Sequence, residues 1–170
     1  MIIGVIGPNK FEHLLQVNEY TIEDIKDKLD YLAKDLAKSG HEILLTPDKD
    51  SVLYFIGKRY IENGGKRVNL LIPKEEHDYL KYLDITLGDI INCNLWRNKP
   101  ARFNEESDII VCVGFSGMAL AEIGFSKYYN PKTIYIIKDF ISSELPKELH
   151  NSLKIKYLKL SELKEVLKGL

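Results

Sequence analysis

The sequence has few residues suited to disulfide or metal chemistry. Among its 170 residues are two cysteines, Cys93 and Cys112, which have no CxxC spacing and cannot form a disulfide framework. The four histidines are scattered along the chain and never stand at metal-ligand spacing, so we expect no metal site. Because disulfides are typical of oxidising compartments, their absence favours a cytoplasmic protein.

Long apolar runs and a surplus of basic charge are also missing. No run approaches the roughly 18 apolar residues of a membrane helix, and residues 1–7 lack the basic region and cleavage site of a signal peptide. The chain carries 24 Lys and Arg against 25 Asp and Glu, a net charge of -1. Nucleic-acid binders usually carry excess basic residues, so we expect neither a nucleic acid nor a membrane as partner. A small phosphorylated ligand needs only a few donors and remains compatible with this charge.

What the sequence does contain is an alternation of short apolar runs with amphipathic segments, which is typical of an α/β fold. Strands are expected at residues 2–6, 42–46, 67–72, 108–113, 133–137 and 153–158. Helices are expected at residues 22–38 after an N-cap at Thr21, and at 51–62, 118–129, 145–149 and 161–167. Residues 74–101 fit either one helical face or an irregular loop. We predict a single Rossmann-like three-layer domain over residues 1–170, with a mainly parallel sheet of about six strands.

Two of the expected strands end in glycine turns, where ligands of open α/β sheets bind. The second turn runs directly into a helix, whose free N–H groups and dipole attract a phosphate. Alternatively, its glycines only permit a tight turn. The turns predict a nucleotide or phosphate site built from Gly7, Pro8 and Asn9 on one side and Gly114, Phe115, Ser116, Gly117 and Met118 on the other.

Two charged residues near the second turn are candidates for catalysis. Glu122 lies in the second turn of the expected helix among apolar neighbours. There it could act as a nucleophile, a general base or an acceptor for a ribose hydroxyl, or it could simply face solvent. Arg97 precedes the same strand, and its planar guanidinium suits a phosphate or a carboxylate. Its neighbour Trp96 could stack on a base, or lie in the core or a subunit contact.

Four segments of the chain form a recognisable pattern: IGVIG at residues 3–7, SGHEI at 39–43, IENGG at 61–65 and the strand, glycine turn and helical glutamate at 108–122. Through these segments the chain resembles the Lonely Guy (LOG) and SLOG superfamily over residues 2–137. The resemblance implies a Rossmann-like fold, a nucleotide or nucleotide-derived ligand without further cofactor, and a homodimer or higher homo-oligomer. Active members hydrolyse the N-glycosidic bond of a nucleoside monophosphate with an arginine and a glutamate, roles that would fall on Arg97 and Glu122.

The LOG motifs are only partly present. The family's PGGxGTxxE stretch is here GFSGMALAE at residues 114–122, without the proline and the threonine. Thr46-Pro47-Asp48 replaces the family's GGG turn after the second strand. These departures weaken the prediction that the protein hydrolyses a nucleotide more than they weaken the prediction that it binds one.

A second resemblance is to the nucleoside 2-deoxyribosyltransferases. In that family a serine and a glutamate at the spacing of Ser116 and Glu122 bind the substrate and attack C1′ of the sugar. Three hypotheses therefore remain open. The protein is a nucleotide N-glycosidase or deoxyribosyltransferase, a noncatalytic nucleotide-binding or carrier module, or a purely structural component.

Overall fold

The described residues of this computed structural model, 1–17, 19–130 and 132–170, build a seven-stranded sheet in which all neighbouring strands are parallel. The strands, in sheet order, are β4 (Asp89–Asn92), β3 (Val68–Ile72), β2 (Glu42–Leu45), β1 (Ile2–Ile6), β5 (Ile109–Cys112), β6 (Thr133–Ile137) and β7 (Lys154–Leu158). Successive strands extend the sheet from β1 in one direction and from β5 in the other. The strand order thus reverses between β1 and β5, which is where open α/β sheets bind ligands.

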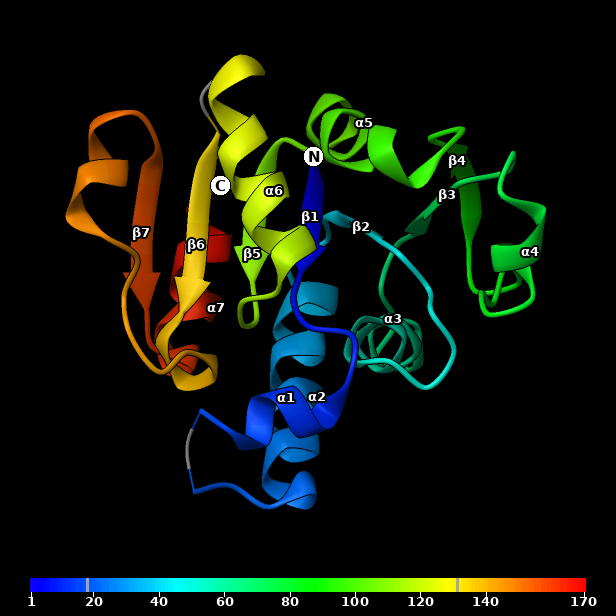
Figure 1. The fold of residues 1–170 in the computed structure, drawn as a ribbon. Coiled ribbons are helices and arrows are strands. Elements are labelled where there is room, and N and C mark those ends of the chain that lie inside the picture. The colour runs from blue at the N-terminus through cyan, green and yellow to red at the C-terminus, as the bar shows by residue number, and fades with distance from the viewer. Residues whose placement is uncertain (18, 131) are drawn as a thin grey trace.

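Helices cover both faces of the sheet (Figure 1). One face packs against α1 (Phe11–Leu15), α2 (Ile22–Lys38), α3 (Val52–Glu62) and α7 (Leu163–Lys168). The other packs against α5 (Lys99–Glu106) and α6 (Gly117–Phe125). Short helices complete the chain: α4 (His77–Leu80), η1 (Trp96–Asn98), η2 (Ser126–Tyr128), η3 (Lys138–Phe140), η4 (Lys147–Asn151) and η5 (Leu160–Glu162). The prediction of a three-layer, Rossmann-like α/β fold is confirmed.

The two faces of the sheet have separate apolar cores because side chains alternate along each strand. In β1, Ile3 and Val5 join the core beneath α2 and α3, whereas Ile6 joins the core beneath α5 and α6. Gly4 points toward α5, where a Cβ would clash with the ring of Phe103. This glycine therefore lets α5 approach β1 closely, which places the start of α5 near the carboxyl ends of the strands.

Several local signals act as the sequence predicts. Thr21 caps α2 in a capping box: its Oγ1 accepts a hydrogen bond from the Asp24 N–H at 3.1 Å, and Asp24 Oδ2 accepts from the Thr21 N–H at 2.8 Å. Gly40 follows this helix with φ at 71°, the left-handed conformation that glycine adopts readily. The lysine-rich strand at residues 153–158 is confirmed as the edge strand β7.

Two expectations are corrected. The continuous helical face considered for residues 74–101 is wrong, since this segment holds α4, strand β4 and the turn η1. Strand β4 has four residues and lies half exposed at the sheet edge, so it shows neither clear alternation nor a continuous apolar run. The last helix does not begin with Ser161 as its cap, because residues 160–162 form η5 and α7 begins at Leu163. Within the described residues, no helix has the length and apolarity to cross a bilayer.

Candidate functional site: the crevice at the strand switch point

A cavity of about 310 Å³ opens at the carboxyl edge of the sheet, where the strand order reverses. This crevice is lined by residues that follow the adjacent strands β2, β1 and β5 and by residues from α1, α3, α4, η1, α5 and α6: Gly7, Asn9, His13, Thr46, Asp48, Leu53, Tyr79, Trp96, Lys99, Ser116 and Met118. Its volume lies at the lower end of the range for small-molecule sites, about 300–1,000 Å³.

A larger cavity of about 490 Å³ lies beside α1, α2 and α3. Its walls consist mainly of helix side chains such as Phe11, Lys26 and Tyr54, together with Asp50 and Ser51 at the end of the loop after β2, and no residue of the turn after β5 lines it. We favour the smaller crevice because it combines the strand switch point with a helix N-terminus and buried ionic groups.

The start of α6 forms one wall of the crevice. Ser116 is the N-cap of this helix, and its Oγ accepts a hydrogen bond from the Ala119 N–H at 3.1 Å. The Ser116 carbonyl accepts from the Leu120 N–H at 2.9 Å. The N–H groups of Gly117 and Met118 precede the first intrahelical bonds and have no partner in the described part of the chain. They are therefore available to an anion.

The glycines of this turn have different structural roles. Gly114 has φ at 115°, and a Cβ there would meet Leu14 and Pro8 side chains, so it is needed for the turn itself. A Cβ on Gly117 would meet nothing within 4 Å, which shows open space beside the helix start. Phe115 packs against the core beneath α6. The structure thus places Gly7, Asn9, Ser116 and Met118 on the crevice wall, and Pro8 and Gly114 behind it.

Glu122 is buried and carries an ion pair that the sequence did not predict. Its side chain and that of Lys99 are 3% and 9% exposed, and Lys99 Nζ lies 2.9 Å from Glu122 Oε1. The contact is an ion pair rather than a well-aligned hydrogen bond, since Oε1 has no partner with hydrogen-bond geometry among the described residues. Burial raises the pKa of Glu122, and the nearby Lys99 ammonium only partly opposes this effect.

The pair is held by a buried amide between α5 and α6. Asn104 Nδ2 donates to the carbonyl of Pro100 and to the carbonyl of Glu122, both at 2.9 Å. One side chain therefore joins the backbones of both helices next to the ion pair. Lys99 lines the crevice, so its ammonium connects the buried carboxylate with the ligand space.

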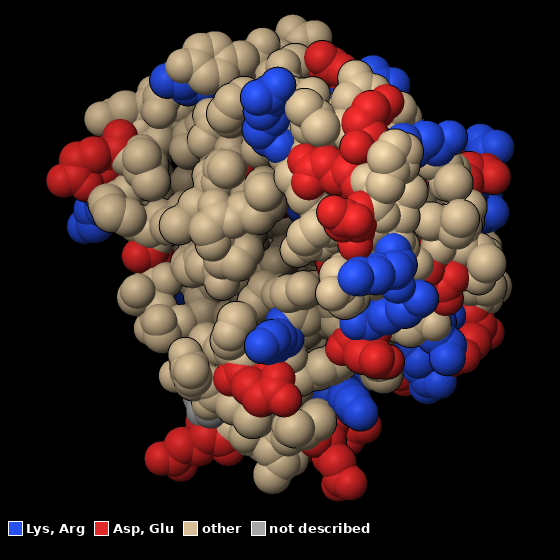
Figure 2. All heavy atoms as spheres, turned by 45° about the vertical axis from the view of Figure 1, so that its right-hand side comes forward, with Lys and Arg blue, Asp and Glu red and all other residues tan. Residues whose placement is uncertain are grey.

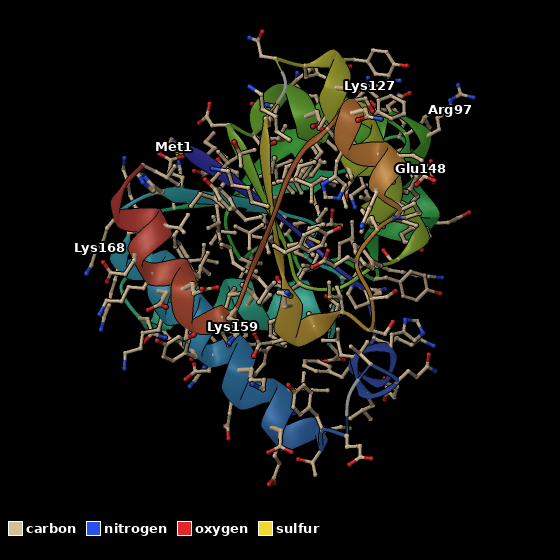
Figure 3. All side chains as sticks on the ribbon, turned by 90° about the vertical axis from the view of Figure 1, so that its left-hand side faces the viewer. Met1, Arg97, Lys127, Glu148, Lys159 and Lys168 are labelled. Atoms are coloured by element: carbon tan, nitrogen blue, oxygen red, sulfur yellow. The ribbon has the colours of Figure 1, made fainter. Side chains whose placement is uncertain are left out.

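Arg97 is not beside Glu122, contrary to the arrangement that the sequence analysis considered. It lies exposed in η1, and Figure 3 shows its side chain at the outer edge of the molecule, extending away from the fold. The tight turn η1 directs Arg97 outward, whereas Trp96 and Lys99 line the crevice. Lys99 was missed because it is one of many lysines, which are almost always exposed. The Pro100 that follows it does signal a helix start.

Polar and aromatic groups form the opposite wall. Asp48 follows β2, and burial raises the pKa of its carboxyl, although attraction to Lys99 lowers it. The rings of Tyr79 and Trp96 meet edge to face with centroids 5.0 Å apart, and Lys99 Nζ lies 5.8 Å from the Trp96 ring. Thr46 Oγ1 and Trp96 Nε1 are buried without a hydrogen-bond partner in the residues described. In the part of the chain that the structure describes, no group of three or more His, Cys, Asp or Glu side chains could hold a metal ion.

Comparison with known proteins shows a shared fold. No family model matches the sequence, and no curated protein matches it. The molybdenum cofactor binding protein of Rippkaea orientalis aligns with a TM-score of 0.73 at 18% identity, over 99% of this chain and 95% of that chain. The molybdenum cofactor carrier protein of Chlamydomonas reinhardtii gives 0.71 at 19% identity, over 99% and 96%. The protein TM1055 gives 0.73 at 16% identity, over 99% of both chains. At these identities the likeness establishes the Rossmann-like architecture of the chain.

Proposed function

We propose that this protein binds a nucleotide or nucleotide-like, phosphate-bearing small molecule in the crevice and acts as a binding or carrier protein. One observation carries the proposal: Ser116 and Met118 at the start of α6, where the N–H groups of Gly117 and Met118 are unpartnered among the described residues, line the same crevice as Lys99. A helix N-terminus and a lysine together suit a phosphate group. The naming of two structural neighbours as molybdenum cofactor binding or carrier proteins supports a carrier role.

The state of Glu122 favours binding over hydrolysis. A nucleophile or general base must come within hydrogen-bond reach of the reacting atom, about 3 Å. Glu122 is 2% exposed, does not line the crevice, and has Lys99 between it and the ligand space. LOG-like hydrolysis and deoxyribosyl transfer would both need this carboxylate at the ligand. The LOG-like assignment thus stands here as a proposal for nucleotide binding without turnover.

The proposal is tested by titrating the purified protein with nucleoside monophosphates and the corresponding nucleosides in a calorimeter. We expect binding of monophosphates and at least tenfold weaker binding of nucleosides, because the phosphate occupies the start of α6. The variant Ser116→Asp keeps an N-cap side chain but places a negative charge there, and should lose at least tenfold in affinity. Thr21→Asp, the same kind of change at the cap of α2, is the matched control and should bind normally. Failure of all monophosphates to bind would overturn the proposal.

The same preparation tests hydrolysis. Each monophosphate is incubated with the protein and the free base is measured by chromatography. Carrier function predicts no release above the rate without protein. Base release by the wild type above that rate would contradict binding without turnover, and its loss in a Glu122→Gln variant that thermal melting shows to be folded would establish an N-glycosidase that uses Glu122.

We also propose that two copies associate through the outer face of α6. Met118, Leu120 and Phe125 are exposed on this helix, and its one charged residue, Glu122, is buried. Figure 2 shows a broad area without charged side chains on the face of the molecule toward α6. A helix that is apolar on all sides is normally covered, and the LOG resemblance implies a homodimer. Sedimentation should give twice the 19.6 kDa chain mass, and Leu120→Glu should give monomers, whereas a monomeric wild type would contradict the dimer.

A further inference from the structure

We infer that the crevice selects the ring of its ligand through Asp48, whose carboxylate accepts two hydrogen bonds from a heterocycle with adjacent ring N–H and amino donors. Guanine presents this edge. The inference rests on the proposed function, because the phosphate at α6 fixes the direction in which the ring points. It assigns to Asp48 a role in ligand specificity.

The strand order sets the distance between the two ends of the ligand. Strand β1 lies between β2 and β5, so Asp48 after β2 and Ser116 after β5 flank the crevice from opposite sides of the β1 terminus. Two strand spacings amount to about 9.6 Å. This separation is comparable with that between the phosphate and the hydrogen-bonding edge of the base in a nucleoside monophosphate. A ligand anchored at α6 would thus bring its ring to Asp48.

The Asp48 carboxylate lacks protein donors other than its own backbone N–H. Among the described residues no other group donates a hydrogen bond to it and none forms a close ion pair with it, although the Lys99 ammonium attracts it across the crevice. Asp48 is half-buried, and a carboxylate that loses part of its water without gaining donors loses free energy of solvation. A ring with two adjacent donors would supply the missing hydrogen bonds in the bidentate geometry that carboxylates accept.

Two further groups on the same wall suit a planar ring. Trp96 lines the crevice with its ring braced by Tyr79, and aromatic faces stack on nucleic-acid bases. Thr46 is 3% exposed, and its Oγ1 has no partner within the described part of the chain. Its hydroxyl can donate to the keto oxygen that lies beside the ring N–H in guanine. Adenine would instead place a ring acceptor against the Asp48 carboxylate.

The test is a set of titrations followed by fluorescence of Trp96, the only tryptophan in the chain. We expect GMP to bind at least tenfold more tightly than AMP, and IMP to lie between them because it lacks the amino group. Asp48→Asn removes one acceptor and adds a donor, so it should weaken GMP binding at least tenfold and abolish the preference over AMP. Thr46→Val should weaken GMP binding and leave AMP binding nearly unchanged.

The neighbouring residue Asp50 offers a matched control. Asp50 lines the other cavity and has φ at 60°, a conformation that asparagine also tolerates. Asp50→Asn should therefore leave every affinity unchanged, and thermal melting should show that Asp48→Asn is folded.

The outcomes separate this inference from the proposed function. Equal binding of GMP and AMP by the wild type, or a GMP preference that survives Asp48→Asn, overturns the role of Asp48 while phosphate-dependent binding still stands. Binding that does not need the phosphate overturns the proposed function itself. Pterin rings also carry a ring N–H beside an amino group. The titrations therefore include the monophosphate of a pterin alcohol as a further ligand. If it binds more tightly than GMP and loses that affinity in Asp48→Asn, the inference holds with a pterin as the source of the edge.

Discussion

Lys99 Nζ lies 2.9 Å from Glu122 Oε1, and both side chains are almost completely withdrawn from solvent. The pair joins the first residue of α5 to the second turn of α6, directly behind the crevice. Removing either partner of a buried ion pair leaves an uncompensated charge, whereas replacing both by apolar residues is often neutral. The pair therefore stabilises the relative position of the two helices.

The first prediction concerns the coupling of these two residues. Glu122→Leu leaves the Lys99 ammonium buried without a counter-charge and should lower the free energy of unfolding by about 3–5 kcal/mol. Lys99→Met should cost less, because Glu122 already has a raised pKa and can become protonated. The double variant Lys99→Met with Glu122→Leu should be close to the wild type. Urea denaturation at pH 7 of all four proteins measures the cycle.

The pair also predicts a dependence on pH. Without Lys99, the pKa of Glu122 in the folded state rises further above its unfolded value, so protonation favours folding. The difference in free energy of unfolding between the wild type and Lys99→Met should therefore become smaller as the pH falls from 7 toward 4.5. Single-variant losses that simply add in the double variant, at every pH, would contradict the coupling.

The second prediction concerns the cap of α6. Ser116→Ala removes the acceptor for the Ala119 N–H, so it should lower the free energy of unfolding by about 1 kcal/mol. Ser116→Asn keeps a capping acceptor and should restore most of this loss. Thermal denaturation of the three proteins checks the prediction. An unchanged melting temperature in Ser116→Ala would show that the hydroxyl does not stabilise the helix start.

The third prediction concerns a buried carboxylate far from the crevice. Asp35 in α2 is 6% exposed with Oδ2 unpartnered among the described residues, and burial raises its pKa despite the nearby lysines. When the pKa of a carboxyl group is higher in the folded than in the unfolded protein, the free energy of unfolding falls as the pH rises above the unfolded-state pKa. The cost is absent at lower pH, where the group is protonated in both states. Asp35→Asn should therefore raise the melting temperature at pH 7 by up to about 3 °C, and the gain should disappear near pH 3.5. Asp27→Asn, an exposed change in the same helix, should have no effect at either pH.

The fourth prediction concerns thiol reactivity. Burial raises the pKa of Cys93 to about 11 and that of Cys112 to about 12. The thiolate is the reactive form, so at pH 8 a disulfide reagent should modify neither cysteine of the native protein over minutes. In urea both should react at once, which gives the count of thiols. Rapid reaction of either cysteine in the folded protein would show that its surroundings open.

Much of the fold could be predicted from the sequence because the inner strands are continuous apolar runs between clear turn signals. Strand β5, for example, is completely buried and stands out as IIVC before Gly114. Strand β4 could not be predicted in this way, because DIIN lies at the sheet edge and is held largely by backbone pairing with β3. Such pairing is a long-range contact that local periodicity does not report.

The site was predictable where backbone conformation determines it and less so where side-chain direction does. The glycine turn and the helix start at residues 114–118 follow from local sequence, although the role of Ser116 as the N-cap of α6 was not predicted. Whether Arg97 or Lys99 pairs with Glu122 depends on which residues of η1 and α5 face inward. The two residues are only two positions apart in the chain, so the sequence does not distinguish them. Asp48 was noted only as part of a turn, because its place in the crevice depends on the order of β2, β1 and β5.

The Asn104 amide, which bridges the Pro100 and Glu122 carbonyls, has a consequence for motion. Because of this bridge, α5 and α6 cannot separate on their side of the crevice without breaking a buried hydrogen bond. The facing side, formed by the turn after β2 and the segment after α4, is tied as well, because the Lys49 N–H donates to the Tyr82 carbonyl at 2.8 Å and the Asp84 N–H to the Pro47 carbonyl at 2.9 Å. With both sides fixed in this way, a ligand would meet a preformed crevice rather than one that closes around it.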